Sequence, residues 1–255
     1  MYREQRITVV IPCYNEERGL PRVLAKIPAE VDEILVLDNR SSDRTVEVAL
    51  RDPRVRVVQH PVNLGYGGSY LRGLPMASGD VLVTTDGDGT YPVEDALQLV
   101  DALLDRGLDF VSASRFPLAN PGCMTARNQF GNAVLNFLVR VVYGLKLRDA
   151  QTGMWAFRKR VLDRLDLHNT GMAFSNEIKI EAFGRRDVAA AEIPIRYAER
   201  IGESKLYPFT DGVRMAAFLL SRRLLGPRRA NGADPLPAEA SRVITAAERA
   251  AGAGV

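Results

Sequence analysis

The sequence predicts an α/β fold in which a mostly parallel sheet is covered by helices on both faces. Through the first 115 residues, short runs that are apolar on both faces alternate with segments of helical periodicity. Strands of that kind are typical of parallel sheets with helices on either side. The chain has 255 residues, 46% of them hydrophobic and 25% charged, which is enough for a sizeable core.

The strand candidates are short apolar runs bounded by turn residues. The clearest are "ITVVIP" and "EILVLDN", which have the length of buried strands. In chain order, strands are expected at 7–12, 33–39, 55–60, 80–86, 108–115, 152–159 and 190–199.

The segments between these strands show apolar residues at helical spacing. Ser42 or Asp43 is a good N-cap for the second helix. Gly73 and Pro75 weaken the helical pattern of residues 67–77. In chain order, helices are expected at 16–27, 42–50, 67–77, 93–107, 126–144, 175–184 and 211–226.

The end of the chain differs in composition from the rest. Residues 230–255 are rich in Ala, Gly and Pro and have few large apolar side chains, so a mobile tail is expected there. We therefore expect one domain over residues 1–210, a basic amphipathic helix at 211–229, and the tail.

Several classes of protein are disfavoured by the bulk numbers. A net charge of +3 gives no indication of nucleic-acid binding, although it would not repel an anionic substrate. Cys13 and Cys123 have no metal-site spacing, which favours a reduced, cytoplasmic compartment. The N-terminus has no signal-peptide pattern, and no apolar run reaches the ~18 residues of a membrane span. His60 and His168 carry no motif and are expected to be structural or surface residues.

Polar side chains follow three of the predicted strands at the point where each ends. Tyr14, Asn15 and Glu16 follow the first strand, and Asp38 ends the second. The fourth strand runs into "DGDGT", with two carboxylates one residue apart. Ligands bind at the carboxyl ends of strands in open parallel sheets, so these residues predict a site at one sheet edge. The first turn lacks G-x-G-x-x-G, which disfavours a Rossmann dinucleotide site.

Two of these motifs have a purely structural interpretation as well as a functional one. Asp86 and Asp88 repel each other, so the pair is either a solvated turn or a cation site. The glycines of "NLGYGGS" at 63–69 either cradle a ligand or form a tight loop.

Seven motifs in a fixed order resemble those of one enzyme family. They are "IPCYNEE", "LDNRSSDRT", "NLGYGG", "DGDGTYP", "SR", "DAQTGMWAF" and "RIGESKL", between residue 7 and about residue 207. Together they resemble the family 2 glycosyltransferases, in the branch of dolichyl-phosphate mannose synthase and other polyprenyl-phosphate glycosyltransferases. The resemblance implies a GT-A fold, a nucleotide-diphosphate sugar donor, a polyprenyl phosphate acceptor, and Mg²⁺ or Mn²⁺ as cofactor.

The resemblance also assigns roles on the donor side. Asp86 and Asp88 match a D-x-D motif that holds the metal, with Asp88 the more direct ligand and Asp86 facing the ribose or the metal. Arg200, Ser204 and Lys205 match a loop that clamps the diphosphate, and Asp86, Asp88, Arg200 and Lys205 are the implied catalytic residues. The implied nucleotide-sugar site comprises Pro12, Tyr14, Glu16, Asp38, Asn63, Gly65, Asp86, Gly87 and Asp88.

The chain departs from many relatives at Asn39 and Arg40, where those relatives have Asp-Gly. Arg40 would place a cation beside the implied nucleotide pocket. The base of the donor nucleotide is therefore left open.

On the acceptor side, the resemblance implies that Arg115, Arg127 and Asn128 bind the acceptor phosphate, with Gln151 and Thr152 near the sugar. Arg127 equally suits a surface position on the predicted helix. A phosphate monoester is already anionic at pH 7, so transfer to it needs no general base. An alcohol acceptor would need one, and Glu177 and Glu181 are the candidates, although two Glu at that spacing also suit an exposed helix face.

Two alternatives to a lipid-linked product stay open. One is a family 2 enzyme with a soluble small-molecule acceptor, and the other is a non-catalytic module that binds nucleotide sugars. Residues 214–225 combine arginines with large apolar residues, a pattern that suits either a helix in the membrane interface or a helix packed on the core.

Overall fold

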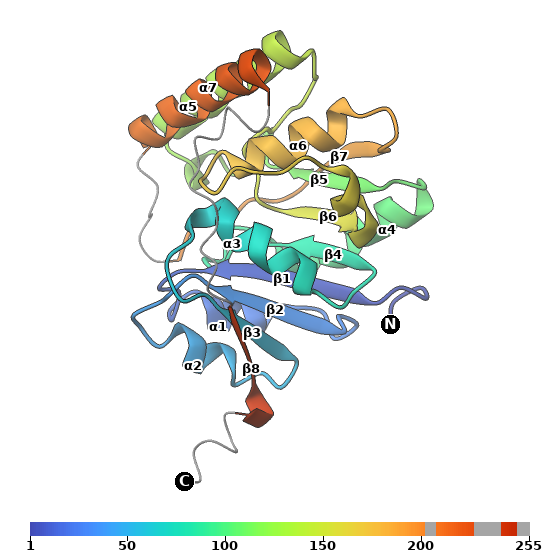
Figure 1. The fold of residues 1–255 in the computed structure, drawn as a ribbon, viewed down its shortest axis with the longest axis vertical. Coiled ribbons are helices and arrows are strands. Elements are labelled where there is room, and N and C mark those ends of the chain that lie inside the picture. Colours follow the sequence, from blue (N-terminus) through green and yellow to red (C-terminus); the bar gives the residue numbers. More distant parts are fainter. Residues whose placement is uncertain (202–207, 227–240, 249–255) are drawn as a thin grey trace.

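The computed structural model describes residues 1–201, 208–226 and 241–248. It confirms the predicted α/β architecture and the predicted order of elements (Figure 1). The strands are β1 (Ile7–Cys13), β2 (Glu33–Asp38), β3 (Val55–Gln59), β4 (Val81–Thr84), β5 (Phe110–Ser114), β6 (Trp155–Arg158), β7 (Ala190–Pro194) and β8 (Arg242–Thr245). The α-helices are α1 (Leu20–Leu24), α2 (Thr45–Ala49), α3 (Gly65–Gly73), α4 (Ala96–Asp105), α5 (Ala126–Tyr143), α6 (Phe174–Gly184) and α7 (Pro208–Leu225).

All eight of these strands form one mixed sheet in the order β7-β5-β6-β4-β1-β2-β3-β8. β1 lies parallel to both β2 and β4, and β3 continues this parallel block beside β2. β6 runs antiparallel between β4 and β5. Because β1, β2 and β4 are parallel neighbours, their carboxyl ends meet at one edge, where the sequence predicts the site.

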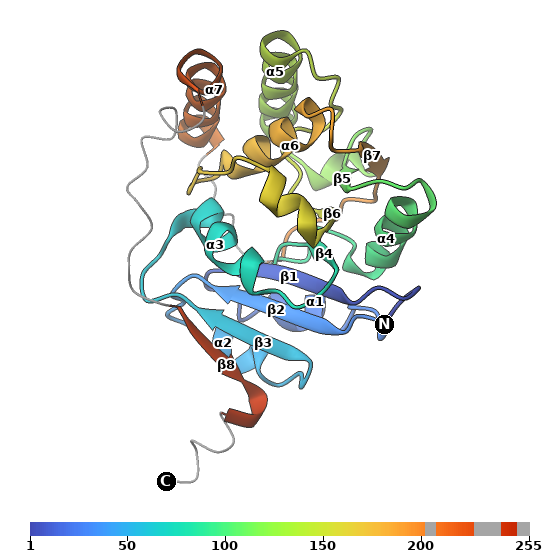
Figure 2. The ribbon, with the colours of Figure 1, turned by 45° about the vertical axis from the view of Figure 1, so that its right-hand side comes forward.

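Each face of the sheet has its own apolar core, because side chains alternate along a strand. Ile7, Val9 and Ile11 of β1 pack with α1, α2 and α4, whereas Val10 packs with α3 and α6 on the opposite face. Figure 2 shows these two helical layers on either side of the sheet. This pattern explains why the strands read as continuous apolar runs.

Helices α5 and α7 form a third layer at one end of the molecule, where they lie side by side (Figures 1 and 2). Met215, Phe218 and Leu219 of α7 pack with Leu135 and Val139 of α5 in a separate apolar cluster. Among the described residues, no helix combines the length and the apolar character that crossing a membrane demands.

The prediction of a mobile tail was wrong for residues 242–245, which form the edge strand β8. β8 pairs antiparallel with β3, and its neighbour Ser241 lies 2.8 Å from Nδ1 of the buried His60. Val243 and Ile244 pack against opposite apolar cores of the sheet. Val243 and Ile244 favour a strand because they are β-branched, and the edge of β3 is available for pairing. The Ala-, Gly- and Pro-rich residues on either side of them gave no indication of this strand.

Candidate active site

The acidic turn after β4 contains two carboxylates in different surroundings. Asp88 accepts hydrogen bonds through Oδ1 from the main-chain N and Oγ1 of Thr90, at 2.9 and 2.7 Å. Its Oδ2 lies 2.5 Å from the Arg200 guanidinium. Oδ1 of Asp86, in contrast, is buried and has no hydrogen-bond partner among the described residues. The sequence expectation made Asp88 the more direct metal ligand, but it is Asp86 that has an oxygen available.

The electrostatics of this turn favour a bound cation. Burial and the charge of Asp88 raise the pKa of Asp86 to about 7, although the charge of Arg200 opposes them. A cation beside Asp86 would offset the cost of burying its charge. In the described part of the chain, no cluster of three or more His, Cys, Asp or Glu side chains could hold a metal alone. The two carboxylates therefore fit a Mg²⁺-type ion that takes its other ligands from water and a diphosphate.

Arg200 lies beside Asp88, because the chain after β7 is hydrogen-bonded to the acidic turn. The main-chain N of Ala198 donates to Thr90 O, and that of Ile201 donates to Asp88 O, each at 2.9 Å. The Arg200 guanidinium is thereby held against Asp88. Ser204 and Lys205, the other members of the implied diphosphate clamp, lie outside the described residues.

The loops after β1 and β2 are joined by hydrogen bonds. Asn15, at φ +56°, donates from its main-chain N to Ser41 Oγ and accepts from the main-chain N of Ser42. Asp38 is fully buried, and its Oδ1 accepts from the main-chain N of Ser41. The other oxygen, Oδ2, is buried without a partner in the described structure. Asp38 can therefore accept a hydrogen bond from a ligand, as the nucleotide assignment requires.

The remaining nucleotide candidates of β1 surround the same edge. Pro12 lies in β1 opposite Leu37, and Tyr14 is 41% exposed just beyond the strand. A Cβ atom on Gly87 would lie 3.3 Å from Cγ of Glu16, so the Glu16 side chain packs against the acidic turn. The structure thus brings the implied residues of β1 and β4 together.

The glycine stretch packs against protein main chain. A Cβ on Gly65 would lie 2.5 Å from Thr170 O, and one on Gly67 would lie 2.0 Å from Asn169 O. The main-chain N of Gly68 donates to Thr170 O at 2.9 Å. The close approach that these glycines permit is to residues 169–171 of the same chain. Of the two interpretations of these glycines, this packing favours the tight loop over the ligand cradle.

Asn39 and Asn63 have a structural role at the same loop. Asn63 Oδ1 accepts from Asn39 Nδ2 and from the main-chain N of Gly65, both at 2.9 Å. Asn39 Oδ1 in turn accepts from the main-chain N of Leu64 at 2.7 Å. Arg40, at φ +63°, donates to Pro61 O. Asn39 and Arg40, which stand where many relatives have Asp-Gly, therefore attach the loop after β2 to residues 61–65. The motif comparison missed this role.

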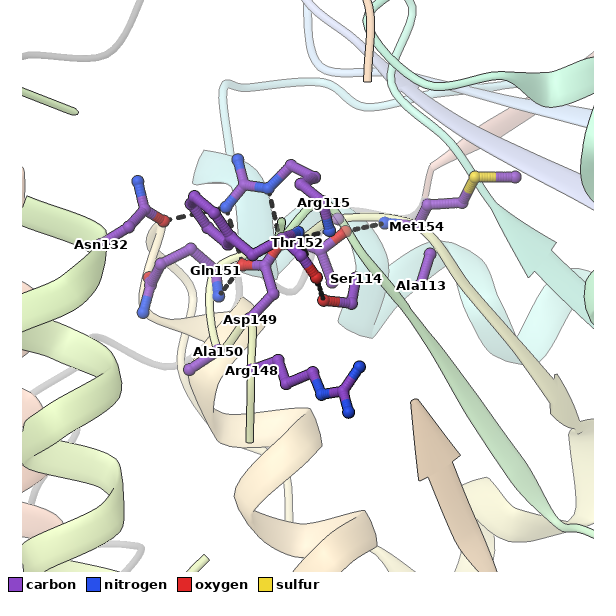
Figure 3. Close-up of polar contacts among 12 residues, drawn as sticks. Ala113, Ser114, Arg115, Asn132, Arg148, Asp149, Ala150, Gln151, Thr152 and Met154 are labelled. Carbon is purple, nitrogen blue, oxygen red and sulfur yellow. Dashed lines mark hydrogen bonds and ion pairs between the residues drawn. The ribbon is translucent and has the colours of Figure 1, made fainter. Parts of the chain in front are cut away.

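Arg115, directly after β5, forms the centre of a second charged group (Figure 3). Its Nε and NH2 atoms donate to the two carboxylate oxygens of Asp149 at 2.7 and 2.8 Å, and NH2 also donates to Asn132 Oδ1 at 2.9 Å. Burial raises the pKa of Asp149, but the charge and hydrogen bonds of Arg115 outweigh burial and lower it to about 2. Asp149 is therefore ionised and holds Arg115 in one orientation.

Arg115 retains hydrogen-bonding capacity for an anion. A guanidinium has five N–H donors, and the two on NH1 make no hydrogen bond within the described ranges. Asn132 connects Arg115 to the first turns of α5, because its Nδ2 donates to Asn128 O at 2.7 Å. Asn128 Oδ1 is buried without a partner in the described chain, whereas Arg127 is exposed.

The segment 148–152 is held by side chains from several elements. Glu192 accepts from the main-chain N of Arg148 and Asp149, and Asn136 Oδ1 accepts from that of Ala150. Asn176 and Lys179 donate to carbonyl oxygens of the same segment. Both amide atoms of Gln151 are buried and have no partner among the residues described. The sequence analysis did not predict that these side chains bind the segment 148–152. A polar residue at a position where the helical pattern expects an apolar one is a signal that could identify such residues.

Glu177 and Glu181 are neither an exposed helix face nor positioned as a base. Arg222 of α7 donates to Glu177 Oε1 at 2.6 Å and to Glu181 Oε1 at 2.7 Å. Glu177 is fully buried, and its Oε2 accepts from the main-chain N of His168 and Asn169. The two carboxylates therefore attach α7 to α6, because a buried charge is stable only with a partner.

Two curated relatives are similar over most of this chain. A dolichyl-phosphate hexose transferase of Haloferax volcanii is 36% identical over 215 residues, which cover 83% of this chain and 91% of that protein. A low-salt glycan biosynthesis hexosyltransferase of the same organism is 32% identical, over 84% of this chain. This chain spans about half the length of the second relative, at 53%.

Solved structures of glucosyl-3-phosphoglycerate synthase from Mycobacterium tuberculosis have the same fold, which confirms the GT-A expectation. The complex with UDP gives a TM-score of 0.65 at 26% identity, covering 91% of this chain and 82% of that one. The complex with Mn²⁺, UDP and phosphoglyceric acid gives a TM-score of 0.67 at 22% identity, covering 95% and 87%. Residues 8–166 match the family model described as Glycosyl transferase family 2. With its fold, its acidic turn and these matches, the chain belongs to glycosyl transferase family 2.

Proposed function

We propose that this protein transfers a hexosyl or N-acetylhexosaminyl group from a nucleoside-diphosphate sugar to the phosphate of a polyprenyl phosphate. The observation that carries the proposal is the pairing of two charged groups at one sheet edge. Among the described residues, Asp86 has an oxygen without a partner and Arg115 has two donors that make no hydrogen bond. The charge of Arg115 also acts on Asp86. A site that suits both a cation and an anion matches a donor diphosphate and an acceptor phosphate. The relative named dolichyl-phosphate hexose transferase supports the same substrates.

On the donor side, Asp38 Oδ2 would accept a hydrogen bond from the nucleoside. The Glu16 side chain packs against the acidic turn. Asp86, with Asp88, would hold Mg²⁺ or Mn²⁺ against the diphosphate. Such a cation supplies Lewis-acid stabilisation of the charge on the departing nucleoside diphosphate. Arg200 would bind the same phosphates, in exchange for its ion pair with Asp88.

On the acceptor side, a phosphate monoester oxygen would attack the anomeric carbon. The bond from that carbon to the diphosphate breaks, and the configuration inverts in a single displacement. The second pKa of a phosphate monoester is about 6, so the nucleophile needs no proton removed at neutral pH. Arg115 would orient the phosphate through its NH1 donors, and catalysis would rest on positioning and charge stabilisation.

We also propose that α5 and α7 contact the membrane that contains the lipid acceptor. Apart from Met1 and Tyr14, all the exposed large apolar side chains of the described residues lie on these two helices. On α5 they repeat at helical spacing along one face, and on α7 they do the same: Phe130, Val134, Phe137 and Val141, and Phe209, Val213, Leu220 and Leu224. An apolar surface of that extent marks an interaction site.

Two further features favour lipid as the partner of this surface. Arg127, Arg140, Arg214 and Arg223 are exposed on the same two helices, where they would attract anionic headgroups. The first turns of α5 carry Asn128 and Asn132, which belong to the proposed acceptor site. Part of the apolar surface and part of the proposed acceptor site therefore lie on the same helix, α5.

The experiment that tests the reaction follows a labelled sugar. Purified protein is incubated with Mg²⁺, a polyprenyl phosphate and each of a panel of labelled UDP- and GDP-sugars, with and without a chelator. One donor is expected to label the organic phase, and the chelator to abolish labelling. Asp86→Asn is expected to lower transfer by about 100-fold, the scale of losing a charge that stabilises the transition state.

Asp95→Asn is the matched control, since Asp95 lies at the start of α4 and its carboxylate is bonded only to Gln98 among the described residues. This variant is expected to transfer at the wild-type rate. Nucleotide release without lipid labelling would replace the lipid by a soluble acceptor. Full transfer by Asp86→Asn would remove the acidic turn from the mechanism.

A further inference from the structure

Lys179 is a fully buried lysine in the middle of α6. It lies between Ile178 and Ile180 and is 0% exposed. Lysine is almost never fully buried unless its ammonium has partners, because burying an unpaired charge costs several kcal/mol. No step of the proposed reaction uses this side chain, so its partners indicate its role.

The partners of Lys179 are carbonyl oxygens of the segment beside Arg115. Its Nζ donates to Thr152 O at 2.8 Å and to Asp149 O at 3.2 Å. The ammonium also lies 5.8 Å from the ring centroid of Trp155, whose Nε1 donates to the same Thr152 O at 2.9 Å. Lys179 therefore bridges both ends of the segment 149–152.

The bridged segment carries the side chains that would meet the substrates. Asp149 holds the Arg115 guanidinium through two hydrogen bonds, and Gln151 contributes a buried amide without a partner among the described residues. The other anchors of the segment come from different elements: Asn136 of α5, Asn176 of α6 and Glu192 of β7. Of the anchors on α6, Lys179 is the one that can carry a charge.

We propose that Lys179 is a positioning residue for the acceptor phosphate, acting through the segment 149–152 on Asp149 and Arg115. The inference rests on the proposed function for the identity of the acceptor. Its structural part, that Lys179 fixes this segment, can be tested without any substrate.

The charges around Lys179 make its role pH-dependent. Burial lowers the pKa of Lys179 to about 7, Asp149 and Glu192 oppose that shift, and Arg115 adds to it. Below pH 7 the positive charges of Lys179 and Arg115 together balance the carboxylates of Asp149 and Glu192. Above pH 7 Lys179 is neutral, so the surroundings of the acceptor site have one positive charge fewer. Binding of an anionic phosphate is therefore expected to weaken as the pH rises through 7.

The test compares Lys179→Met with Lys159→Met. Lys159 is a matched control, because its Nζ also donates to a main-chain carbonyl, that of Ala77, at 2.5 Å and away from the site. Lys179→Met is expected to raise KM for polyprenyl phosphate on the order of tenfold and to leave KM for the donor unchanged. Lys159→Met is expected to match the wild type in both. Lys179→Gln keeps one donor without the charge, and an intermediate KM is expected.

A pH profile separates positioning from a merely structural role. The wild-type kcat/KM for the acceptor is expected to fall above pH 7, and this falling limb is expected to be absent in Lys179→Met and Lys179→Gln. A falling limb that persists in both variants, or an unchanged acceptor KM, would overturn the proposal. If neither variant folds, the wild-type profile decides alone, and a flat profile above pH 7 counts against it.

Amide hydrogen exchange of residues 148–153 tests the structural part independently of activity. Faster exchange is expected in Lys179→Met and wild-type rates in Lys159→Met, because the loosened segment opens more often. Unchanged protection in Lys179→Met would overturn the proposal even if transfer is observed. A third outcome is that the wild type transfers sugar to no lipid, while exchange is still faster in Lys179→Met than in the wild type. That outcome would contradict the proposed function and leave the role of Lys179 standing.

Discussion

At the scale of single residues, the buried carboxylates are of two kinds. Some form ion pairs with arginines, and others have an oxygen without a hydrogen-bond partner among the described residues. Asp149 and Glu177 are buried against Arg115 and Arg222, respectively, and hold parts of the structure together. Asp38 and Asp86 are also shielded, yet each has an oxygen without a partner in the described chain. Because unsatisfied buried acceptors are costly, the second kind is where a ligand is expected to bind.

Asp149→Asn is expected to lower the free energy of unfolding at pH 7 by about 3–5 kcal/mol, because it leaves the buried Arg115 without its counter-charge. The pKa of Asp149 falls from 3.8 in the unfolded chain to about 2 in the folded one. The stability it contributes is therefore complete above pH 3.8 and is lost as the pH falls toward 2. The difference between wild type and variant should accordingly shrink in that range.

Urea unfolding at pH 7 and near pH 2.5 measures both effects. Asp187→Asn is the control, since Asp187 forms an exposed ion pair with Arg185 and pairs of that kind contribute little. A difference between wild type and Asp149→Asn that does not change with pH would contradict the assigned ionisation.

At the scale of elements, the active edge depends on close contact between segments far apart in the sequence. The start of α3 approaches residues 169–171 so closely that Gly68 N bonds to Thr170 O. The chain after β7 is bound to the acidic turn in the same way, through Ala198 and Ile201. Each contact fixes the conformation of a loop that its local sequence does not determine. The conformation of the candidate site therefore depends on the complete fold.

Gly67→Ala is expected to destabilise the protein by about 1–3 kcal/mol, because the new Cβ would lie 2.0 Å from Asn169 O and 2.7 Å from Cβ of Phe174. Gly131→Ala is the opposite case, since Gly131 lies within α5 with nothing within 4 Å of the added Cβ. That substitution is expected to stabilise the protein by about 0.5–1 kcal/mol. Thermal or urea unfolding of both variants checks the pair, and equal effects would refute the packing argument.

At the scale of the whole molecule, the polar and apolar surfaces are divided between two regions. The sheet edge holds the charged groups of the candidate active site, and the α5–α7 layer holds most of the exposed apolar side chains described. α7 packs on the protein through Met215, Phe218, Leu219 and the buried Arg222, whereas its other large apolar side chains are exposed: Phe209, Val213, Leu220, Leu224 and Leu225. The packed side chains agree with the interpretation of a helix packed on the core, and the exposed ones form the surface that the proposed membrane contact would use.

The double change Phe137→Glu and Leu224→Glu is expected to weaken binding to vesicles of mixed neutral and anionic phospholipid on the order of 100-fold, at about 1.5–3 kcal/mol for each large apolar side chain. Both side chains are exposed, at 63% and 80%, so the fold should tolerate the change. Gln98→Glu on α4 adds a negative charge elsewhere and should bind as the wild type does. Vesicle flotation measures the difference, and equal binding by all three proteins would rule out this surface.

The sequence alone predicts the mostly parallel sheet and the edge at which the candidate residues lie. Apolar runs alternating with helical segments predict the strands in chain order, and the motifs place Asp38, Asp86, Asp88 and Arg200 in the candidate site. The structure brings the ends of β1, β2 and β4 together because neighbouring parallel strands share one edge, whereas the roles of these residues stay predictions.

The partners of those residues, in contrast, follow from the tertiary structure. It placed Asp149 against Arg115, Lys179 against the segment 149–152, and β8 against β3. It also packed the glycines of α3 on protein main chain and occupied Glu177 with Arg222. Each of these contacts joins segments separated by tens of residues or more along the chain. Periodicity and motifs report local structure, whereas the partner of a buried charge or an open strand edge is set by the packing of the complete fold.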